Sequence, residues 1–197
     1  MTMKVLILDT CAIVKFFINE CGSETVRYIV DNRAKLGLSL SASIFARLEF
    51  EKLIWKKVAY NNVSKSKAKS IIESANTYFS LVFHIRDTYP IPEFKIGRPM
   101  EYEQIIKKYD LSIGQNDRDI LQLMCAHNYL GCFGLAEESR PHIVTSDHNF
   151  LKITKAEGYG VIDPEKLSPQ DLHRKWTSPT KGWNRRREIR GFSVRPE

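Results

Sequence analysis

The chain has 197 residues, of which 43% are hydrophobic and 27% are charged, and its formal net charge is +7. These values are ordinary for a soluble globular protein and suit one α/β domain with an extension better than two full domains. No apolar run approaches the roughly 18 residues of a membrane span, and the first apolar run ends in an acid where a signal peptide needs small residues. We therefore expect a cytoplasmic protein without membrane contact.

Most of the positive charge lies at the C-terminal end of the chain. Residues 172–197 hold eight basic and two acidic side chains, a net charge of +6, which leaves +1 for the other residues. We therefore predict a domain over 1–165 and a basic extension over 166–197, which contacts a polyanion through Arg185, Arg186 and Arg187. A solvated, partly disordered terminus without a partner is the alternative.

The cysteines, Cys11, Cys21, Cys125 and Cys132, show no C-x-x-C spacing. The absence of C-x-x-C spacing argues against a zinc site and against a disulfide framework. We expect reduced and mostly buried thiols.

The stretch from Lys4 to Asp9 is almost wholly apolar and ends in a carboxylate. An unbroken run of Val, Leu and Ile predicts a strand that is buried on both faces, as in a parallel sheet covered by helices. Asp9 then falls at the carboxyl end of the strand, where ligands bind in open α/β sheets. The alternative is that Asp9 caps the helix that follows.

The next elements alternate between helix and strand. The patterns predict helices over 12–18 and 23–36, a short strand over 38–40, and a strong helix from Ser41 or Ser43 to Trp55 or Val58. We expect the apolar positions of this last helix to be Ile44, Phe45, Leu48, Leu53, Ile54 and Trp55.

Glu49 does not fit the polar surface of that helix. It lies four residues after Phe45 and four before Leu53, so helical geometry puts its carboxylate on the apolar face. A charge there is costly unless something pairs with it. The alternatives are an edge position or a buried salt bridge on one side, and a ligand for a bound cation on the other.

A lysine-rich segment opens the next helix. Lys65 and Lys69 share one helical face and could contact phosphates, although a solvated first turn is the alternative. Residues 81–85 are either a strand or a helix end, residues 89–99 are predicted to be a loop, and residues 100–109 a short helix.

Residues 111–116 are a predicted loop, and residues 117–130 form a second strong helix. Its apolar positions wrap most of its circumference, which predicts burial between the sheet and other helices. Asp117 has the position of an N-cap, and Asp119 lies within the first turn, where the helix dipole favours an anion. A pure capping role for both is the alternative.

After a loop over 131–140, a short buried strand at 142–145 leads into Thr145, Ser146 and Asp147. Two buried strands that each end in an aspartate are expected when neighbouring parallel strands present carboxylates at one edge of a sheet. A helix over 149–157 and a strand at 161–162 complete the domain.

The candidate site combines the carboxylates of Asp9, Glu49, Asp119 and Asp147. If they converge, their mutual repulsion raises their pKa values unless a divalent cation neutralises them. Oxygen ligands without Cys or His favour Mg²⁺ or Mn²⁺, as one or two ions, and such a site suits phosphodiester hydrolysis. Thr145 and Ser146 are expected to hold the acids or a metal-bound water by hydrogen bonds.

In its order of acids, the sequence resembles a PIN-domain ribonuclease of the kind found in VapC-type toxins of bacterial and archaeal toxin–antitoxin pairs. The motifs that carry the resemblance are 7–11 (Ile-Leu-Asp-Thr-Cys), 46–49 (Ala-Arg-Leu-Glu), 119–126 and 143–150. The resemblance implies a three-layer α/β/α fold with a central, mostly parallel sheet of four to five strands. It also implies Mg²⁺- or Mn²⁺-dependent cleavage of single-stranded RNA, frequent dimerisation and an antitoxin protein as partner.

Carried over residue by residue, the resemblance makes Asp9, Glu49, Asp119 and Asp147 metal ligands or residues that orient the attacking water. Asp117 matches the motif less well and is expected to be a cap or an auxiliary ligand. Cys11 occupies a place where small hydroxyl or amide residues are common in the family.

Three functions compete. The first is a metal-dependent endoribonuclease acting on single-stranded or structured RNA. The second is a catalytically inactive module of the same fold that binds RNA or acts as a scaffold. The third is an aspartate-based phosphatase, but that chemistry needs an acid two residues after Asp9, where Cys11 stands.

Overall fold

The strands form one parallel sheet in a computed structural model that describes residues 4–86, 104, 107–109, 119–124, 126 and 141–177. Among these residues the sheet has the order β3-β2-β1-β4-β5, and every neighbouring pair is parallel. The strands are β1 (Lys4–Leu8), β2 (Leu38–Ser43), β3 (His84–Arg86), β4 (His142–Val144) and β5 (Gly160–Ile162). The first strand of the chain therefore lies at the centre of the sheet.

The helices connect these strands and begin at residues suited to capping. They are α1 (Thr10–Phe17), α2 (Ser23–Asp31), α3 (Ile44–Ala59), α4 (Lys65–Leu81), α8 (His148–Ala156) and α9 (Pro169–Thr177). Ser43 and Ser64 each accept a backbone N–H from the first turn of the following helix, α3 and α4 respectively. Residues 104, 107–109, 119–124 and 126 are helical as well.

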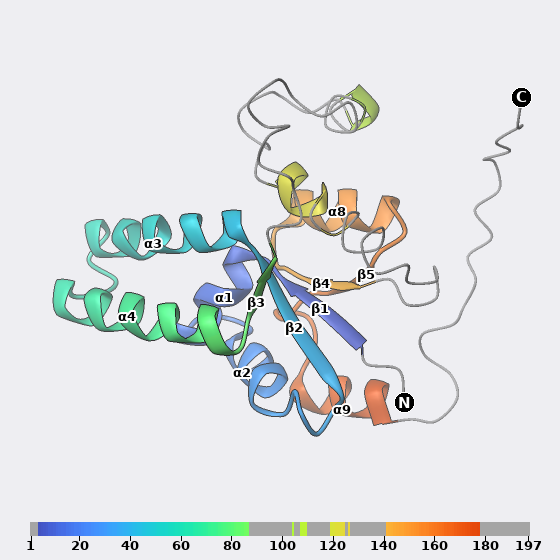
Figure 1. Cartoon of the computed structure of the whole chain (residues 1–197), viewed down its shortest axis with the longest axis horizontal. Coiled ribbons are helices and arrows are strands. Elements are labelled where there is room, and N and C mark those ends of the chain that lie inside the picture. Colours follow the sequence, from blue (N-terminus) through green and yellow to red (C-terminus); the bar gives the residue numbers. More distant parts are fainter. Residues whose placement is uncertain are drawn as a thin grey trace, which may run out of the picture.

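Alternate residues of β1 face two separate cores. Leu6 and Leu8 pack with apolar residues of α1, α2, α3, α4 and α9, whereas Ile7 packs with α8 and with Ile120, Leu123, Met124 and Ala126. Figure 1 shows α8 on one side of the sheet and α2 on the other. Helices therefore cover both faces of the sheet, and the expected three-layer α/β/α fold with a central, mostly parallel sheet is confirmed. Cover on both faces also explains why the central strand is almost wholly apolar.

The α3–α4 hairpin projects sideways from the body of the domain (Figure 1). The residues that α3 buries are Ala46, Phe50 and Ile54. Leu48, which we expected to be buried, is 68% exposed, and Trp55 is 37% exposed. The prediction was wrong for both because only one narrow side of a projecting helix contacts a neighbour.

Several element boundaries differ from those predicted. α2 ends at Asp31, and turns lead from it to Gly37, whose φ of +64° suits a glycine. β2 continues to Ser43, three residues beyond its predicted end, because its pairing with β1 and β3 extends it. The ambiguous stretch 81–85 ends α4 at Leu81 and enters β3 at His84.

Helix α9 was not predicted, and it changes the expected domain boundary. Leu172 is fully buried in the same core as α2, and the Thr25 hydroxyl donates to the Leu167 carbonyl at 2.6 Å. Tyr28 and His173 also share a hydrogen bond of 2.7 Å. The packed domain therefore runs at least to Thr177 and does not end at residue 165.

Some predictions lie outside the described residues. These are the loops at 89–99, 111–116 and 131–140 and the basic residues 178–197, together with Asp117, Cys125, Cys132, Arg185, Arg186 and Arg187. None of the described helices combines the length and the apolar character that crossing a membrane requires.

Candidate functional site

Asp9 lies at the carboxyl edge of the sheet, directly after β1. Leu8 is paired with Val144 of β4, and the backbone N–H of Asp9 donates to the Val144 carbonyl at 3.0 Å. The two strand-end aspartates therefore follow neighbouring parallel strands, as predicted. Asp9 itself is only 4% exposed.

The Asp9 carboxylate accepts four hydrogen bonds. Its Oδ1 accepts from the Thr10 backbone N–H at 2.6 Å and from Gln122 Nε2 at 2.8 Å. Its Oδ2 accepts from the Thr145 hydroxyl at 2.6 Å and from the Cys11 thiol at 3.0 Å. Since a carboxylate offers about four lone-pair sites, its hydrogen-bonding capacity is filled. Asp9 does cap α1 through Thr10, but three of its partners are side chains.

Burial and hydrogen bonding act on Asp9 in opposite directions. Burial raises the pKa of the Asp9 carboxyl above its ordinary value, and the hydrogen bonds from Thr145, Cys11 and Gln122 offset only part of that rise. Burial, followed by the nearby charge of Asp9, also raises the pKa of the Cys11 thiol well above its ordinary value. Cys11 therefore keeps its proton at neutral pH and serves as a donor.

The structure connects Glu49 to this cluster through Thr10. Glu49 is partly exposed at the border of the buried face of α3, so the expected position on the apolar face holds only in part. The Thr10 hydroxyl donates to Glu49 Oε2 at 2.9 Å, while the Thr10 backbone N–H donates to Asp9. A single threonine thus joins the first and second predicted acids.

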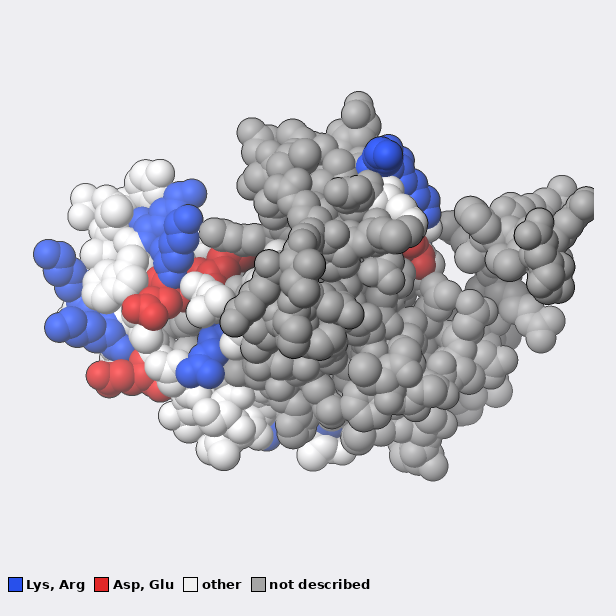
Figure 2. Space-filling model, turned by 45° about the horizontal axis from the view of Figure 1, so that its top comes forward, with Lys and Arg blue, Asp and Glu red and all other residues white. Residues whose placement is uncertain are grey.

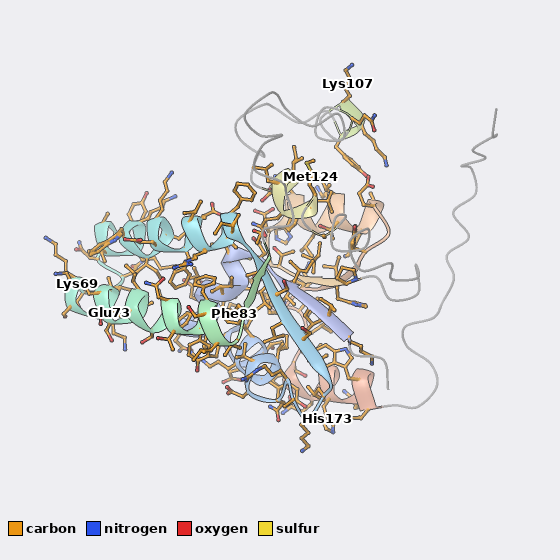
Figure 3. The ribbon with its side chains drawn as sticks, viewed as in Figure 1. Lys69, Glu73, Phe83, Lys107, Met124 and His173 are labelled. Atoms are coloured by element: carbon orange, nitrogen blue, oxygen red, sulfur yellow. The ribbon has the colours of Figure 1, made fainter. Side chains whose placement is uncertain are left out.

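Asp119, the third predicted acid, begins the described helical residues 119–124 and 126. As predicted, this segment is largely buried, with Ile120, Leu123, Met124 and Ala126 each at most 2% exposed. Figure 3 shows Met124 close to α8. Asp119 lies three positions before Gln122, and residues at this spacing share one helical face. Because Gln122 contacts Asp9, that face is directed toward the strand end.

Asp147 caps α8, a role that was not predicted for it from the sequence. Its Oδ1 accepts the backbone N–H groups of Asn149 at 2.8 Å and Phe150 at 2.9 Å, and the residue is exposed. Its own backbone N–H donates to the Thr145 hydroxyl oxygen at 3.1 Å. Thr145 therefore connects Asp147 to Asp9, as expected of an auxiliary residue.

Ser146 and Cys11 make a further contact between the segment after β4 and α1. The Ser146 backbone N–H donates to the Cys11 sulfur at 3.3 Å. Cys21 is exposed, so the prediction of mostly buried thiols is wrong for it, whereas Cys11 is only partly exposed and its thiol is desolvated.

An ion-pair network beside the site was not predicted. Lys15 is 6% exposed, and its Nζ lies 2.8 Å from Glu165 Oε1 and 3.7 Å from Glu20 Oε2; Glu20 also pairs with Lys57. The hydrogen bond and charge of Lys15, with a smaller contribution from Ser146, hold the pKa of Glu165 below its ordinary value. A lone lysine within the apolar segment 12–18 was the available signal.

Gln122 is the other residue that sequence reasoning missed. It is 1% exposed, and it interrupts an apolar helix at a position where a polar side chain needs a buried partner. That interruption was visible in the sequence, but its partner was not, because Asp9 lies 113 positions away.

The predicted nucleic-acid contacts divide between described and undescribed residues. Lys65 and Lys69 are exposed on the first turns of α4, and Lys69 extends from the outer end of the hairpin (Figure 3). Arg185, Arg186 and Arg187 lie outside the described residues.

Comparison of the chain with protein-family models finds no match, and comparison with curated proteins finds none either. Within the described part of the chain, no three His, Cys, Asp or Glu side chains are close enough together to hold a metal ion. The predicted acids Asp9, Glu49, Asp119 and Asp147 offer carboxylate oxygens, the kind of ligand that Mg²⁺ and Mn²⁺ prefer.

Proposed function

We propose that this protein is a metal-dependent endoribonuclease that hydrolyses phosphodiester bonds of RNA with Mg²⁺ or Mn²⁺. The observation that carries the proposal is the buried carboxylate of Asp9 at the carboxyl edge of a parallel sheet, with side-chain hydrogen bonds from Thr145, directly after β4, and from Gln122. A carboxyl group whose burial raises its pKa destabilises the folded state at neutral pH, and such groups are concentrated at functional sites.

In this proposal Asp9, Glu49, Asp119 and Asp147 supply the oxygen ligands for one or two ions. The cation would lower the pKa of a bound water and polarise the phosphoryl group. Thr145 orients Asp9 through its hydroxyl, and Ser146 stands beside it. The chain's own contribution is to hold the carboxylates at one sheet edge before substrate arrives.

The charge of the α3–α4 hairpin supports RNA as the substrate. Residues 51–70, which we call the hairpin end, contain six lysines and one acid, a net charge of +5. The whole chain carries +7 and residues 172–197 carry +6, so the residues outside the hairpin end and outside 172–197 carry −4. Figure 2 shows Lys and Arg side chains gathered over the outer part of this hairpin.

Exposed aromatic side chains accompany these lysines. Tyr60 is 66% exposed and Trp55 is 37% exposed, and Lys52 lies three positions before Trp55 on the same helical face. Lysines that contact phosphates, beside aromatic rings on which bases stack, are typical of surfaces that bind single strands. The hairpin end therefore fits single-stranded RNA.

The lysines at the start of α4 have no evident role in helix stability. The first turn of α4 contains Lys65 and Lys67 and no acid, although a helix N-terminus carries a partial positive charge. Phosphate groups would offset this repulsion. We therefore propose that an RNA strand contacts the hairpin end and reaches the site near Asp9.

The test is cleavage of single-stranded RNA by the purified protein in Mn²⁺. We expect wild type to cleave and Asp9→Asn to cleave at least 100-fold more slowly, on the order of the loss of one charge-stabilising group. Asp31→Asn is the control, because it changes an exposed acid at the end of α2, and it should cleave like wild type. Undiminished cleavage by Asp9→Asn would reject the site.

One observation favours a second function, an RNA-binding or scaffold module without catalysis. All lone-pair sites of the Asp9 carboxylate are occupied by donors, as in a purely structural buried acid. RNA binding that persists in chelator, together with no cleavage in any divalent metal, would establish this alternative. The phosphatase has weaker support, since Cys11 occupies the place of its second acid and donates to Asp9.

Cytoplasmic location, a homodimer, a toxin role and an antitoxin partner belong to the same proposal, and they rest on the sequence and its resemblance alone. Mixing the protein with a candidate antitoxin and measuring both its RNA cleavage and its mass in solution tests the last three together. An unchanged cleavage rate and a monomeric mass would reject them.

A further inference from the structure

Gln122 has a buried carbonyl oxygen that accepts no hydrogen bond from any described residue. The side chain is 1% exposed, so water does not reach it from the surface. Leaving such an acceptor unpaired costs free energy, and native structures tolerate it where a ligand or ion satisfies it in another state. The oxygen belongs to the same amide whose nitrogen donates to Asp9 Oδ1 at 2.8 Å.

We propose that Gln122 is a further cation ligand at this site and that its amide takes the place of the cation in the metal-free protein. The proposal rests on the proposed function, because it concerns the ion that Asp9 would bind. Without metal, the Gln122 N–H occupies one lone pair of Asp9 and its oxygen lacks a donor. In the metal-bound protein, Asp9 Oδ1 and Gln122 Oε1 would both coordinate the ion.

The hydrogen-bond pattern around Asp9 explains why Gln122 is the donor that yields. Thr10 donates through its backbone, which is fixed by the first turn of α1. Thr145 and Cys11 donate to the other oxygen, and both also bond to the backbone after β4. Gln122 alone among these donors has a terminal amide that exchanges a donor for an acceptor by rotation.

The charge on Asp9 fixes which way the amide points. An ionised carboxylate repels a carbonyl oxygen, so the nitrogen faces Asp9 and the oxygen is left without a donor. A cation reverses this preference, since it attracts both oxygens. Amide carbonyls are accepted ligands of hard divalent ions beside carboxylates.

The position of Gln122 on its helix agrees with this role. Asp119 shares its face one turn earlier, so a ligand at Gln122 and a ligand at Asp119 lie on the same side of the segment. The neighbouring residues Leu123 and Met124 are at most 2% exposed, which excludes water from the back of the amide.

The test measures the affinity of the metal-free protein for Mn²⁺ by calorimetry, without reference to activity. The variants are Gln122→Met, which keeps the length of the side chain and removes the amide, Gln122→Glu, which keeps an oxygen ligand, and Asp9→Asn. Thr154→Val is the control, because Thr154 is fully buried and its hydroxyl bonds only within α8.

We expect Gln122→Met to weaken Mn²⁺ binding about tenfold or more, the scale at which residues around metal sites act. We expect Gln122→Glu to bind at least as tightly as wild type, and Thr154→Val to bind like wild type. These outcomes together support a ligand role, because a purely structural role would not be rescued by Glu.

Two results overturn the proposal in distinguishable ways. Wild-type affinity in Gln122→Met, with binding lost in Asp9→Asn, rejects Gln122 as a ligand and leaves the proposed function intact. Wild-type affinity in Asp9→Asn rejects the cation site itself. If Gln122→Met does not fold, weakened binding by a folded Gln122→Glu rejects the role of Gln122.

Discussion

The Thr145 hydroxyl donates to Asp9 Oδ2 at 2.6 Å, joining residues 136 positions apart. The contact is possible because β1 and β4 are parallel neighbours and both residues directly follow their strands. The same hydroxyl oxygen accepts the backbone N–H of Asp147. The two strand-end aspartates are therefore held in a fixed relation by one threonine.

This relation predicts that Thr145→Val destabilises the protein more than its match, Thr154→Val. Both threonines are fully buried, but Thr145 donates to a carboxylate and Thr154 to the neutral Phe150 carbonyl. We expect a loss of about 1.5–3 kcal/mol in the free energy of unfolding for the first and about 1 kcal/mol for the second at pH 7. Urea unfolding measures both losses. Equal losses would show that the hydrogen bond from Thr145 to Asp9 stabilises the protein no more than the one from Thr154 to the Phe150 carbonyl.

The second prediction concerns the dependence of stability on pH. Burial raises the folded-state pKa of Asp9 above 3.8, so the folded protein holds this proton more tightly than the unfolded chain. The resulting stabilisation is complete below the unfolded pKa and is lost as the pH rises through the folded pKa. Between the unfolded and the folded pKa of Asp9, we expect wild type to lose stability relative to Asp9→Asn. The loss should be about 1.4 kcal/mol for each unit by which folding raises the pKa of Asp9.

Urea unfolding of both proteins from pH 4 to pH 7 measures this difference. Asp31→Asn, at an exposed residue, serves as the control and should show no such trend. A wild-type advantage that grows with pH would mean that the folded state lowers the pKa of Asp9, contrary to the balance of burial and hydrogen bonds described above.

The third prediction is a difference in cysteine reactivity. The pKa of the Cys11 thiol is raised by burial and by Asp9, and its proton is engaged by the Asp9 carboxylate, whereas Cys21 is exposed. Since the thiolate is the reactive form, iodoacetamide should modify Cys21 on the order of tenfold faster than Cys11 or more. Peptide mass spectrometry over time measures the two rates. The rates should converge in urea, and convergence without urea would contradict the protonated, bonded thiol.

The fourth prediction concerns the hairpin end and RNA. Lys65→Gln and Lys69→Gln should each reduce the slope of log affinity against log salt by about 0.7, the value for one phosphate contact on a single strand. Lys35→Gln, at an exposed lysine in the turn before β2, is the matched control and should leave the slope unchanged. An unaltered slope in both hairpin variants would exclude phosphate contacts at these lysines.

The sequence by itself determined the arrangement of the sheet edge. The apolar runs at 5–8 and 143–144, which lead to Asp9 and Asp147, predicted buried parallel strands, and the structure places these strands side by side. Local signals were sufficient here because strand burial, helix capping and the direction of parallel strands all follow from short segments. The helix predicted over 117–130 rested on the same kind of local signal, its apolar circumference, and its described residues 119–124 and 126 are helical.

Only the tertiary structure decided which side chains contact Asp9 and which apolar residues remain exposed. Gln122 and Thr145 reach Asp9 from segments 113 and 136 positions away, and no periodicity encodes such a distance. Leu48 and Trp55 have the spacing of buried residues, yet α3 projects from the domain and leaves them in solvent. Periodicity fixes the faces of a helix, whereas the packing of distant segments fixes which of those faces is covered.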